Sequence, residues 1–206
     1  MTAVASIRDQ NADRAVAERV LRLASEGLLA IAAGLDMRFF QALDILAAVE
    51  GRVVVTGMGK SGHIARKIAA TLASTGRPAL FVHPSEASHG DLGMIAEGDA
   101  IIALSYSGNT AELAHIVGYA KRFRIPLIAM TGRADSALAE AADAALVLPR
   151  VGEACPHGLA PTTSTTMMLA LGDALAGSTS ATSAASVSAL SDRRVIAING
   201  ILNRRV

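Results

Sequence analysis

A cluster of glycines that includes a lysine and a serine follows directly after an apolar run in the first third of the chain. Residues 53–56 read VVVT and residues 57–62 read GMGKSG. Apolar residues then recur at helical spacing, at Ile64, Ile68 and Leu72. This pattern predicts a strand, a tight turn and a helix. The N–H groups and positive dipole end of such a helix favour an anion, with phosphate the expected ligand, beside Gly59, Lys60 and Ser61.

Two familiar phosphate motifs compete for the same residues. A Walker A loop needs a glycine five positions before Gly59, but Val54 stands there. The glycines fit the dinucleotide pattern G-x-G-x-x-G, but the next apolar run ends at His83 instead of at an acidic residue that would bind ribose. A lysine inside the turn suits a smaller and more exposed phosphate. A dinucleotide site and a glycine turn that only packs a helix on a strand remain open alternatives.

A second group of small polar side chains follows the third apolar run, where residues 105–110 read SYSGNT. Their hydroxyl and amide groups, together with N–H groups of the next helix, could form a second side of the phosphate site. The candidate ligands are Ser105, Ser107, Asn109 and Thr110. Serine, asparagine and threonine are also the best helix caps, so capping explains this pattern about equally well.

Glu112 and His89 are candidate proton-transfer groups. Glu112 stands three residues after Asn109, which is the spacing of a capping box, and on spacing alone the cap is favoured. The functional alternative is a general base that moves a proton between adjacent carbons. His89 lies in the loop after the second apolar run, where it can act as an acid or base near neutral pH or be an ordinary loop histidine.

Five consecutive hydroxyl residues open the last predicted helix, where residues 162–166 read TTSTT. They could bind phosphate oxygens or cap the helix. Cys155 and His157 lie shortly before them, but two candidate ligands fall short of a structural zinc site. We therefore expect no bound metal.

The composition excludes several classes of function. Aromatic residues make up only 3% of the chain and tryptophan is absent, so stacking platforms for bases are scarce. A net charge of +1 indicates no polyanionic partner, and nucleic-acid binding is not expected. The single cysteine, Cys155, suits a reducing cytoplasm. No apolar run of about 18 residues and no targeting segment is present, so we expect a soluble cytoplasmic protein that does not bind membranes.

The elements that position these residues alternate between apolar runs and helical patterns. Two helices are expected at the start, over 12–33 and 36–50. The expected strands are 52–56, 78–83, 99–105, 125–131 and 145–149, and the expected helices between and after them are 61–74, 109–123, 134–142 and 163–176, with a loop over 84–93. This pattern predicts an α/β fold with one doubly wound, five-stranded parallel sheet flanked by helices. Strand order 2-1-3-4-5 would gather ligands at the carboxyl ends of the strands.

The sequence changes character after residue 176. Residues 177–191 are almost entirely Ser, Ala, Thr and Gly and lack a stripe wide enough to dock firmly. We therefore expect one domain over 12–176 and a poorly ordered tail over 177–206. The short apolar segment 195–202 within this tail is either a docking helix or a frayed end.

Four segments together resemble the sugar isomerase (SIS) domain of D-arabinose 5-phosphate isomerases. They are residues 57–62 (GMGKSG), 84–93 (PSEASHGDLG), 105–112 (SYSGNTAE) and 153–156 (EACP). The resemblance covers residues 12–176. The second and fourth segments are specific to this branch of SIS proteins, and residues 88–91 (SHGD) argue against an SIS isomerase of amino sugars or heptoses.

The resemblance implies isomerisation of D-ribulose 5-phosphate to D-arabinose 5-phosphate, the first step toward the eight-carbon acid sugar of lipopolysaccharide. It also implies a homotetramer. Enediol chemistry of this kind requires neither a metal nor a nicotinamide cofactor. The motifs place Lys60, His89 and Glu112 at active-site positions of the family. The motifs also place a set of hydroxyl residues at sugar-phosphate contacts: Ser61, Ser105, Ser107, Thr110 and the turn Ser164-Thr165-Thr166.

The sequence departs from the family in two ways. The family continues to a His-Pro-Gly-Gly segment whose histidine joins the active site, but no histidine follows His157 here. A catalytically impaired SIS module that binds a sugar phosphate is therefore the alternative function, and His157 is a candidate substitute for the missing group. Many members also carry a pair of nucleotide-binding CBS domains. The sequence ends before either could fit, so we expect no nucleotide control through them.

Overall fold

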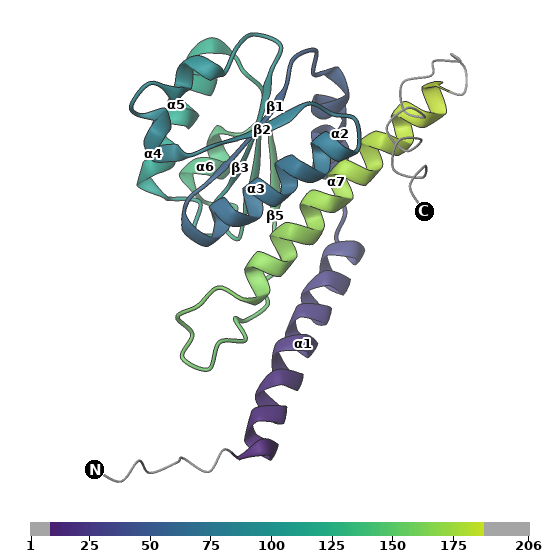
Figure 1. Ribbon diagram of the computed structural model, residues 1–206, viewed down its shortest axis with the longest axis vertical. Coiled ribbons are helices and arrows are strands. Elements are labelled where there is room, and N and C mark those ends of the chain that lie inside the picture. The colour runs from purple at the N-terminus through teal and green to yellow at the C-terminus, as the bar shows by residue number, and fades with distance from the viewer. Residues whose placement is uncertain (1–8, 188–206) are drawn as a thin grey trace, which may run out of the picture.

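Five short strands form one parallel sheet in the order β2-β1-β3-β4-β5 (Figure 1). Their bounds are β1 Val53–Gly57, β2 Ala79–Val82, β3 Ala100–Leu104, β4 Leu127–Thr131 and β5 Ala144–Val147. The strands form because nearly continuous apolar, β-branched runs can be buried on both faces of a parallel sheet. The computed structural model describes residues 9–187. It confirms both the predicted five-stranded parallel sheet and its strand order.

Helices cover both faces of the sheet and create two cores. Helices α2 (Met37–Ala48), α3 (Gly59–Ser74) and α7 (Thr163–Val187) pack with Val53 and Val55 on one face. Helices α4 (Pro84–Ala87), α5 (Ala114–Phe123) and α6 (Ala137–Ala141) pack with Val54 on the other. Successive strand residues thus point to opposite cores, as the two-residue period of a strand requires.

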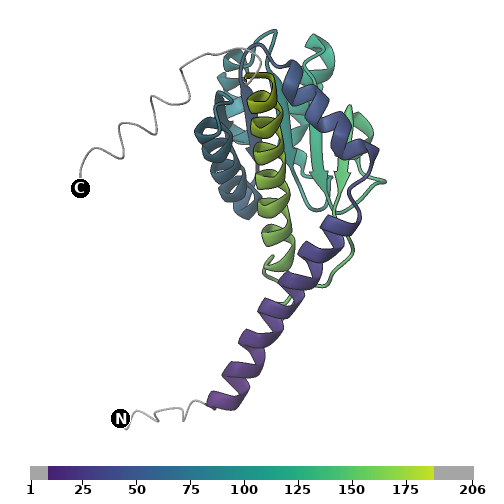
Figure 2. The same ribbon diagram turned by 90° about the vertical axis from the view of Figure 1, so that its right-hand side faces the viewer.

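Helix α1 (Gln10–Ala33) leans against α7 and projects away from the sheet (Figure 2). The carboxylate of Asp9 caps its start by accepting hydrogen bonds from the N–H groups of Asn11 and Ala12. Gly34 ends the helix, as predicted. Among residues 9–187, no helix is both long and apolar enough to span a membrane.

Two segments differ from the predicted pattern. The expected loop over 84–93 holds the short helix α4 and a 3₁₀ turn, Asp91–Met94, because Pro84 starts a helix that His83 caps. The last helix does not stop at 176 but runs to Val187. The Thr179 hydroxyl donates to the carbonyls of Leu175 and Ala176, which keeps this polar residue compatible with a helix. The predicted apolar segment 195–202 lies outside the described residues.

Candidate functional site

Two positions of the turn between β1 and α3 favour glycine for different reasons, close packing at Gly62 and backbone conformation at Gly59. A methyl group on Gly62 would lie 2.6 Å from the Gly57 carbonyl oxygen. Gly59 has a φ of +55°, in the left-handed region that favours glycine. The chain therefore reverses within a few residues and starts α3 with its first N–H groups directed to the carboxyl edge of the sheet. Lys60 is exposed there and Ser61 is half-buried.

The turn after β3 holds a connected group of hydroxyls. Ser105 is 3% exposed, and its hydroxyl lies 2.7 Å from the Thr110 hydroxyl and 3.4 Å from the Ser107 hydroxyl. It also accepts a hydrogen bond from the N–H of Gly108 at 3.0 Å. Because Ser107 is exposed and Thr110 only half-buried, these hydroxyls form an edge that a phosphate or sugar oxygen could reach.

The two turns lie on neighbouring strands. Gly57 at the end of β1 pairs with Leu104 at the end of β3. Helices α3 and α5 leave these strands on opposite faces of the sheet, so the topology switches between the two strand ends. Ligands bind at such a switch point in open α/β sheets. The structure therefore brings the segment that contains Lys60 and Ser61 beside the one that contains Ser105 and Thr110.

The capping-box interpretation of Asn109 and Glu112 is wrong. The Asn109 side-chain oxygen accepts a hydrogen bond at 3.0 Å from the N–H of Ala137, which starts α6. Thr110, at the start of the 3₁₀ turn Ala111–Leu113, makes no side-chain cap. Glu112 is exposed and has no hydrogen-bond or ion-pair partner within the described part of the chain. Its carboxylate remains available for other chemistry.

The turn before α7 already holds an anion, and that anion is Glu153. Its Oε2 accepts hydrogen bonds from the N–H groups of Thr162 at 2.7 Å and Thr163 at 2.8 Å. Burial by itself raises the pKa of the Glu153 carboxyl, but hydrogen bonds from the Ser164 side chain and the Thr162 backbone outweigh it and lower the pKa below its usual value. Sequence reasoning assigned no role to this carboxylate.

Two other hydroxyls of this turn bond to the helix itself, whereas the buried Thr163 hydroxyl has no hydrogen-bond partner among the described residues. Thr165 and Thr166 each donate to the carbonyl oxygen of Thr162, at 3.0 Å in both cases. Ser61 lies close to the same helix, with its Oγ 4.0 Å from Met168 Sδ. Helix α7 thus borders the β1–α3 turn, but its own N-terminal N–H groups point at Glu153 and not at an open space.

The histidines occupy different settings. His89 and His157 are exposed, and neither side chain has a hydrogen-bond partner among residues 9–187. His83, which sequence reasoning did not select, lies at the carboxyl end of β2, and its Nδ1 accepts the N–H of Ser85 at 3.3 Å. This bond leaves Nε2 to carry the proton of the neutral ring.

The single cysteine lies in the loop before α7. The backbone N–H groups of Ala160, His157 and Leu159 lower the pKa of the Cys155 thiol.

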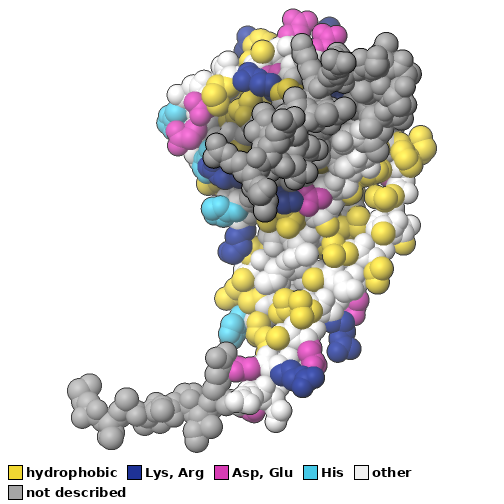
Figure 3. Space-filling model, turned by 45° about the vertical axis from the view of Figure 1, so that its right-hand side comes forward, with side chains coloured by type: hydrophobic (Ala, Val, Ile, Leu, Met, Phe, Trp, Pro, Cys, Tyr) yellow, Lys and Arg dark blue, Asp and Glu magenta, His cyan; other side chains and the backbone are white. Residues whose placement is uncertain are grey.

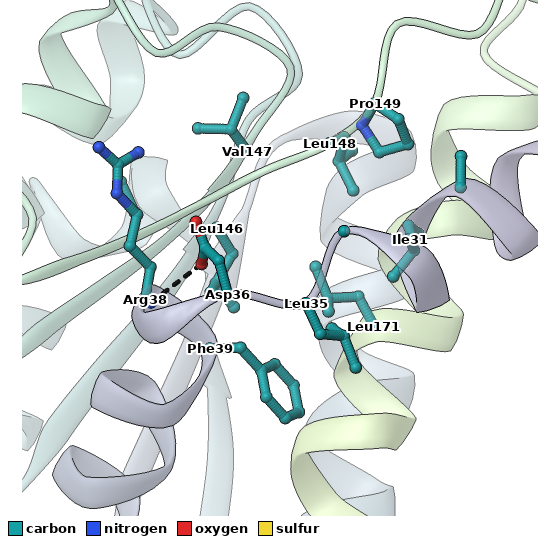
Figure 4. A pocket seen from close by; sticks show the side chains of 13 residues that line it. Ile31, Leu35, Asp36, Arg38, Phe39, Leu146, Val147, Leu148, Pro149 and Leu171 are labelled. Carbon is teal, nitrogen blue, oxygen red and sulfur yellow. Dashed lines mark hydrogen bonds between the residues drawn. The ribbon is translucent and has the colours of Figure 1, made fainter.

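A small cavity of about 140 Å³ lies at the edge strand β5, between this strand and the α1–α2 turn (Figure 4). Leu35, Phe39, Leu148 and Leu171 line it, with Asp36 and Arg38 at its polar side. It lies at β5, and β4 separates β5 from β3, so we base the candidate site on the polar strand-end turns instead. Within residues 9–187 no group of three or more His, Cys, Asp or Glu side chains is placed to hold a metal ion.

Comparisons with known proteins agree with this geometry. The SIS domain model matches residues 46–178. The arabinose 5-phosphate isomerase KdsD of Pseudomonas aeruginosa is 53% identical over 160 residues, covering 78% of this chain and 49% of that protein. KdsD of Escherichia coli K12 is 50% identical over 159 residues, covering 77% and 48%. The chain therefore spans about half of the length of these relatives.

A solved structure is also similar to this chain in its fold. The Escherichia coli CFT073 protein c3406, solved in complex with A5P, has a TM-score of 0.81 and 37% identity to this chain. The alignment covers 85% of this chain and 94% of that one. Fold, strand-end turns and sequence matches agree: the chain belongs to the SIS domain family.

Proposed function

We propose that this protein is an aldose–ketose isomerase that interconverts D-ribulose 5-phosphate and D-arabinose 5-phosphate through an enediol. The observation that carries the proposal is the pairing of a glycine-lysine-serine turn with a hydroxyl cluster on neighbouring strands. Support also comes from the identity to arabinose 5-phosphate isomerases, although the chain matches only about half of their length. The proposal extends their activity to this chain.

The phosphate end of the sugar would be held by the first turn of α3 and by the hydroxyl cluster. In this proposal the main-chain N–H groups of Gly59 and Ser61, at the start of α3, would donate to the phosphate, and Ser105, Ser107 and Thr110 would supply hydroxyls. Asn109 contributes by fixing this loop to α6 through Ala137. Because Glu153 occupies the N-terminus of α7, the turn Ser164-Thr165-Thr166 would contribute side-chain contacts at most.

The carbon chemistry needs one base and one donor. In the direction from ketose to aldose, the base takes a proton from C1, an enediol forms between C1 and C2, and a proton returns to C2. Glu112 suits the base because its carboxylate is exposed and not engaged in a cap. Lys60 or His89 would stabilise the negative charge that develops on the C2 oxygen. Neither a metal nor a nicotinamide takes part in these steps.

One sequence feature favours a second function. The family resemblance places a further active-site histidine after α7 begins, and the chain contains no histidine after His157. A catalytically impaired SIS module would keep the phosphate contacts and bind the sugar without converting it. Replacing His157 with Asn and following turnover from pH 5 to 8 tests whether this residue supplies the missing group.

Binding and turnover measured in parallel separate the two functions. We expect D-arabinose 5-phosphate to bind in a calorimetric titration, and ribulose 5-phosphate to be converted by the same preparation. Binding without conversion would favour the impaired module. The absence of both, in a protein whose circular dichroism shows a folded α/β domain, would contradict either function.

We further propose that the protein acts in the cytoplasm as a homotetramer, in the synthesis of lipopolysaccharide sugars. Support for an assembly comes from large apolar side chains that α1 leaves exposed, including Leu21 and Leu29. Isolated chains rarely leave such patches uncovered. The mass of the protein in solution tests this assembly independently of its activity.

A further inference from the structure

The turn after β3, which carries the hydroxyl cluster, is attached to the segment that joins β4 to α6, residues 131–138. The N–H of Gly132 donates to the carbonyl oxygen of Tyr106 at 2.9 Å. Farther along both segments, the N–H of Leu138 donates to the carbonyl oxygen of Gly108 at 3.0 Å. Main-chain hydrogen bonds at two points therefore fix where the turn lies relative to α6.

The start of α6 uses its first N–H groups to hold this turn. These groups have no partner inside the helix and must find one elsewhere. The N–H of Ala137 donates to the Asn109 side-chain oxygen at 3.0 Å, and the N–H of Leu138 donates to Gly108. The Leu138 side chain is buried in the core on the same face of the sheet. The turn is therefore tied through α6 to the hydrophobic core.

Close packing adds to these hydrogen bonds. A methyl group on Gly108 would lie 2.0 Å from the Ser136 hydroxyl oxygen. Ser136 is fully buried, and its hydroxyl donates to the carbonyl oxygen of Arg133 at 2.8 Å. Gly108 in turn donates its N–H to the Ser105 hydroxyl at 3.0 Å. Two consecutive contacts thus connect the buried Ser136 to the centre of the hydroxyl cluster.

We infer that the β4–α6 segment positions the phosphate hydroxyls, and that Asn109 and Ser136 are positioning residues that do not contact the ligand. This inference rests on the proposed sugar-phosphate site and names residues that set its affinity. Ser136 is fully buried and cannot reach a ligand. Asn109 acts through its side-chain oxygen, which holds the N–H of Ala137 and cannot bond to a phosphate oxygen, because that oxygen is also an acceptor.

The physical effect of this arrangement is preorganisation. A ligand binds more weakly when it must first order the loop that holds it. Here the hydroxyls of Ser105 and Thr110 already lie 2.7 Å apart, on a turn that α6 holds in place. Loosening the turn should therefore lower the affinity for phosphate, even though every hydroxyl of the cluster remains.

Two substitutions of Asn109 separate positioning from direct contact. Asn109→Ala removes the acceptor of the Ala137 N–H and should weaken binding of both inorganic phosphate and arabinose 5-phosphate about three- to tenfold. Asn109→Asp keeps an oxygen for that N–H, beside a helix start that favours negative charge, and should bind within about twofold of the wild type. An aspartate variant that binds more weakly than the alanine variant would overturn the proposal, because the amide would then donate to the phosphate directly.

Asp36 provides a matched control at the start of α2. Its carboxylate accepts a hydrogen bond from the N–H of Arg38 at 2.9 Å (Figure 4). Like Asn109, it is an exposed side chain that holds an N–H group at a helix start. Asp36→Ala should lower the urea midpoint about as much as Asn109→Ala does, but it should leave both affinities unchanged. Wild-type affinity in Asn109→Ala, or an equal loss in Asp36→Ala, would overturn the proposal.

Ser136→Ala tests the buried contact. The substitution removes the hydroxyl that bonds to Arg133 and that caps α6 by accepting the N–H of Ala139. Phosphate binding should weaken about threefold, since the loss of one hydrogen bond loosens the support under Gly108. An unchanged affinity would overturn the assignment of Ser136 as a positioning residue.

Mass and turnover are measured on the same proteins. Figure 3 shows hydrophobic side chains along the projecting part of α1, so a change in association is a competing cause of altered affinity. An affinity loss that appears only together with a lower mass would overturn the proposal. A wild type that binds neither ligand would overturn both this proposal and the proposed function. The expected order of affinities in a protein that converts no ribulose 5-phosphate would support the proposal and contradict the isomerase function alone.

Discussion

The α-carbon of Gly62 faces the carbonyl oxygen of Gly57 so closely that a methyl group would sit 2.6 Å from that oxygen. The contact joins the first turn of α3 to the end of β1. It sets the direction in which α3 leaves the sheet, and with it the position of Lys60 and Ser61. The glycine spacing in this turn is therefore a packing requirement.

Gly62→Ala should destabilise the protein by about 1–3 kcal/mol and weaken sugar-phosphate binding, because the helix must move away from the strand. Gly118→Ala is the matched control. Gly118 lies inside α5 with open space around its α-carbon, so alanine there should raise stability by about 0.5–1 kcal/mol. Urea unfolding and a binding titration measure both variants, and an unchanged Gly62→Ala protein would contradict the tight turn.

Glu112→Gln should lower turnover by about 10²–10⁴ if Glu112 is the general base. Stability should change by no more than a few tenths of a kcal/mol, since the side chain is exposed and makes no cap. Steady-state rates and unfolding curves provide the two readouts. Turnover that stays within threefold of the wild type would exclude Glu112 as the base.

Ser105→Ala should affect both stability and binding. The buried hydroxyl bonds to Thr110 and accepts from Gly108, so its loss should lower the free energy of unfolding by about 1–3 kcal/mol. Binding of arabinose 5-phosphate should weaken about tenfold, because one donor to a charged oxygen is removed. Ser74→Ala, which removes an exposed hydroxyl at the end of α3, should change neither. A destabilised variant with wild-type affinity would show that Ser105 is only structural.

Glu153→Gln should reduce stability in a pH-dependent way. The folded-state pKa of this carboxyl lies below its usual value, so its contribution is present above the unfolded pKa and is lost as the pH falls through the folded pKa. The difference between wild type and variant, about 0.5–2 kcal/mol for a cap, should therefore be full at pH 7 and shrink in acid below about pH 4. Urea unfolding at several pH values measures it. A difference that does not change with pH would mean that the charge of Glu153 does not stabilise α7.

Strand positions followed from the sequence because apolar runs such as Val53–Val55 are long enough to be buried on both faces. The strand order followed from the alternation of strands and helices, because 2-1-3-4-5 is the simplest doubly wound arrangement. The short helix α4 escaped prediction because four residues are too few to show a period. The continuation of α7 escaped because Ser, Ala and Thr show no apolar stripe, although nothing in them breaks a helix.

The errors at the site have a common physical origin. The Asn109 side chain accepts a hydrogen bond from Ala137, 28 residues later in the chain. The Glu153 carboxylate accepts one from Thr162, nine residues later. Local spacing suggested that Asn109 forms a capping box with Glu112, and it suggested no partner for Glu153. Hydrogen bonds set by the tertiary fold cannot be read from spacing alone, whereas the glycine turn at Gly57 and Gly62 can, because its geometry is local.

Incubation of the purified protein with D-ribulose 5-phosphate in D₂O, followed by NMR, tests the isomerase function most directly. Signals of D-arabinose 5-phosphate should grow with time, and part of the product should carry deuterium at C2, because a proton removed to form an enediol can exchange with solvent before one returns. A folded protein that produces no arabinose 5-phosphate above the background without enzyme would contradict the isomerase function.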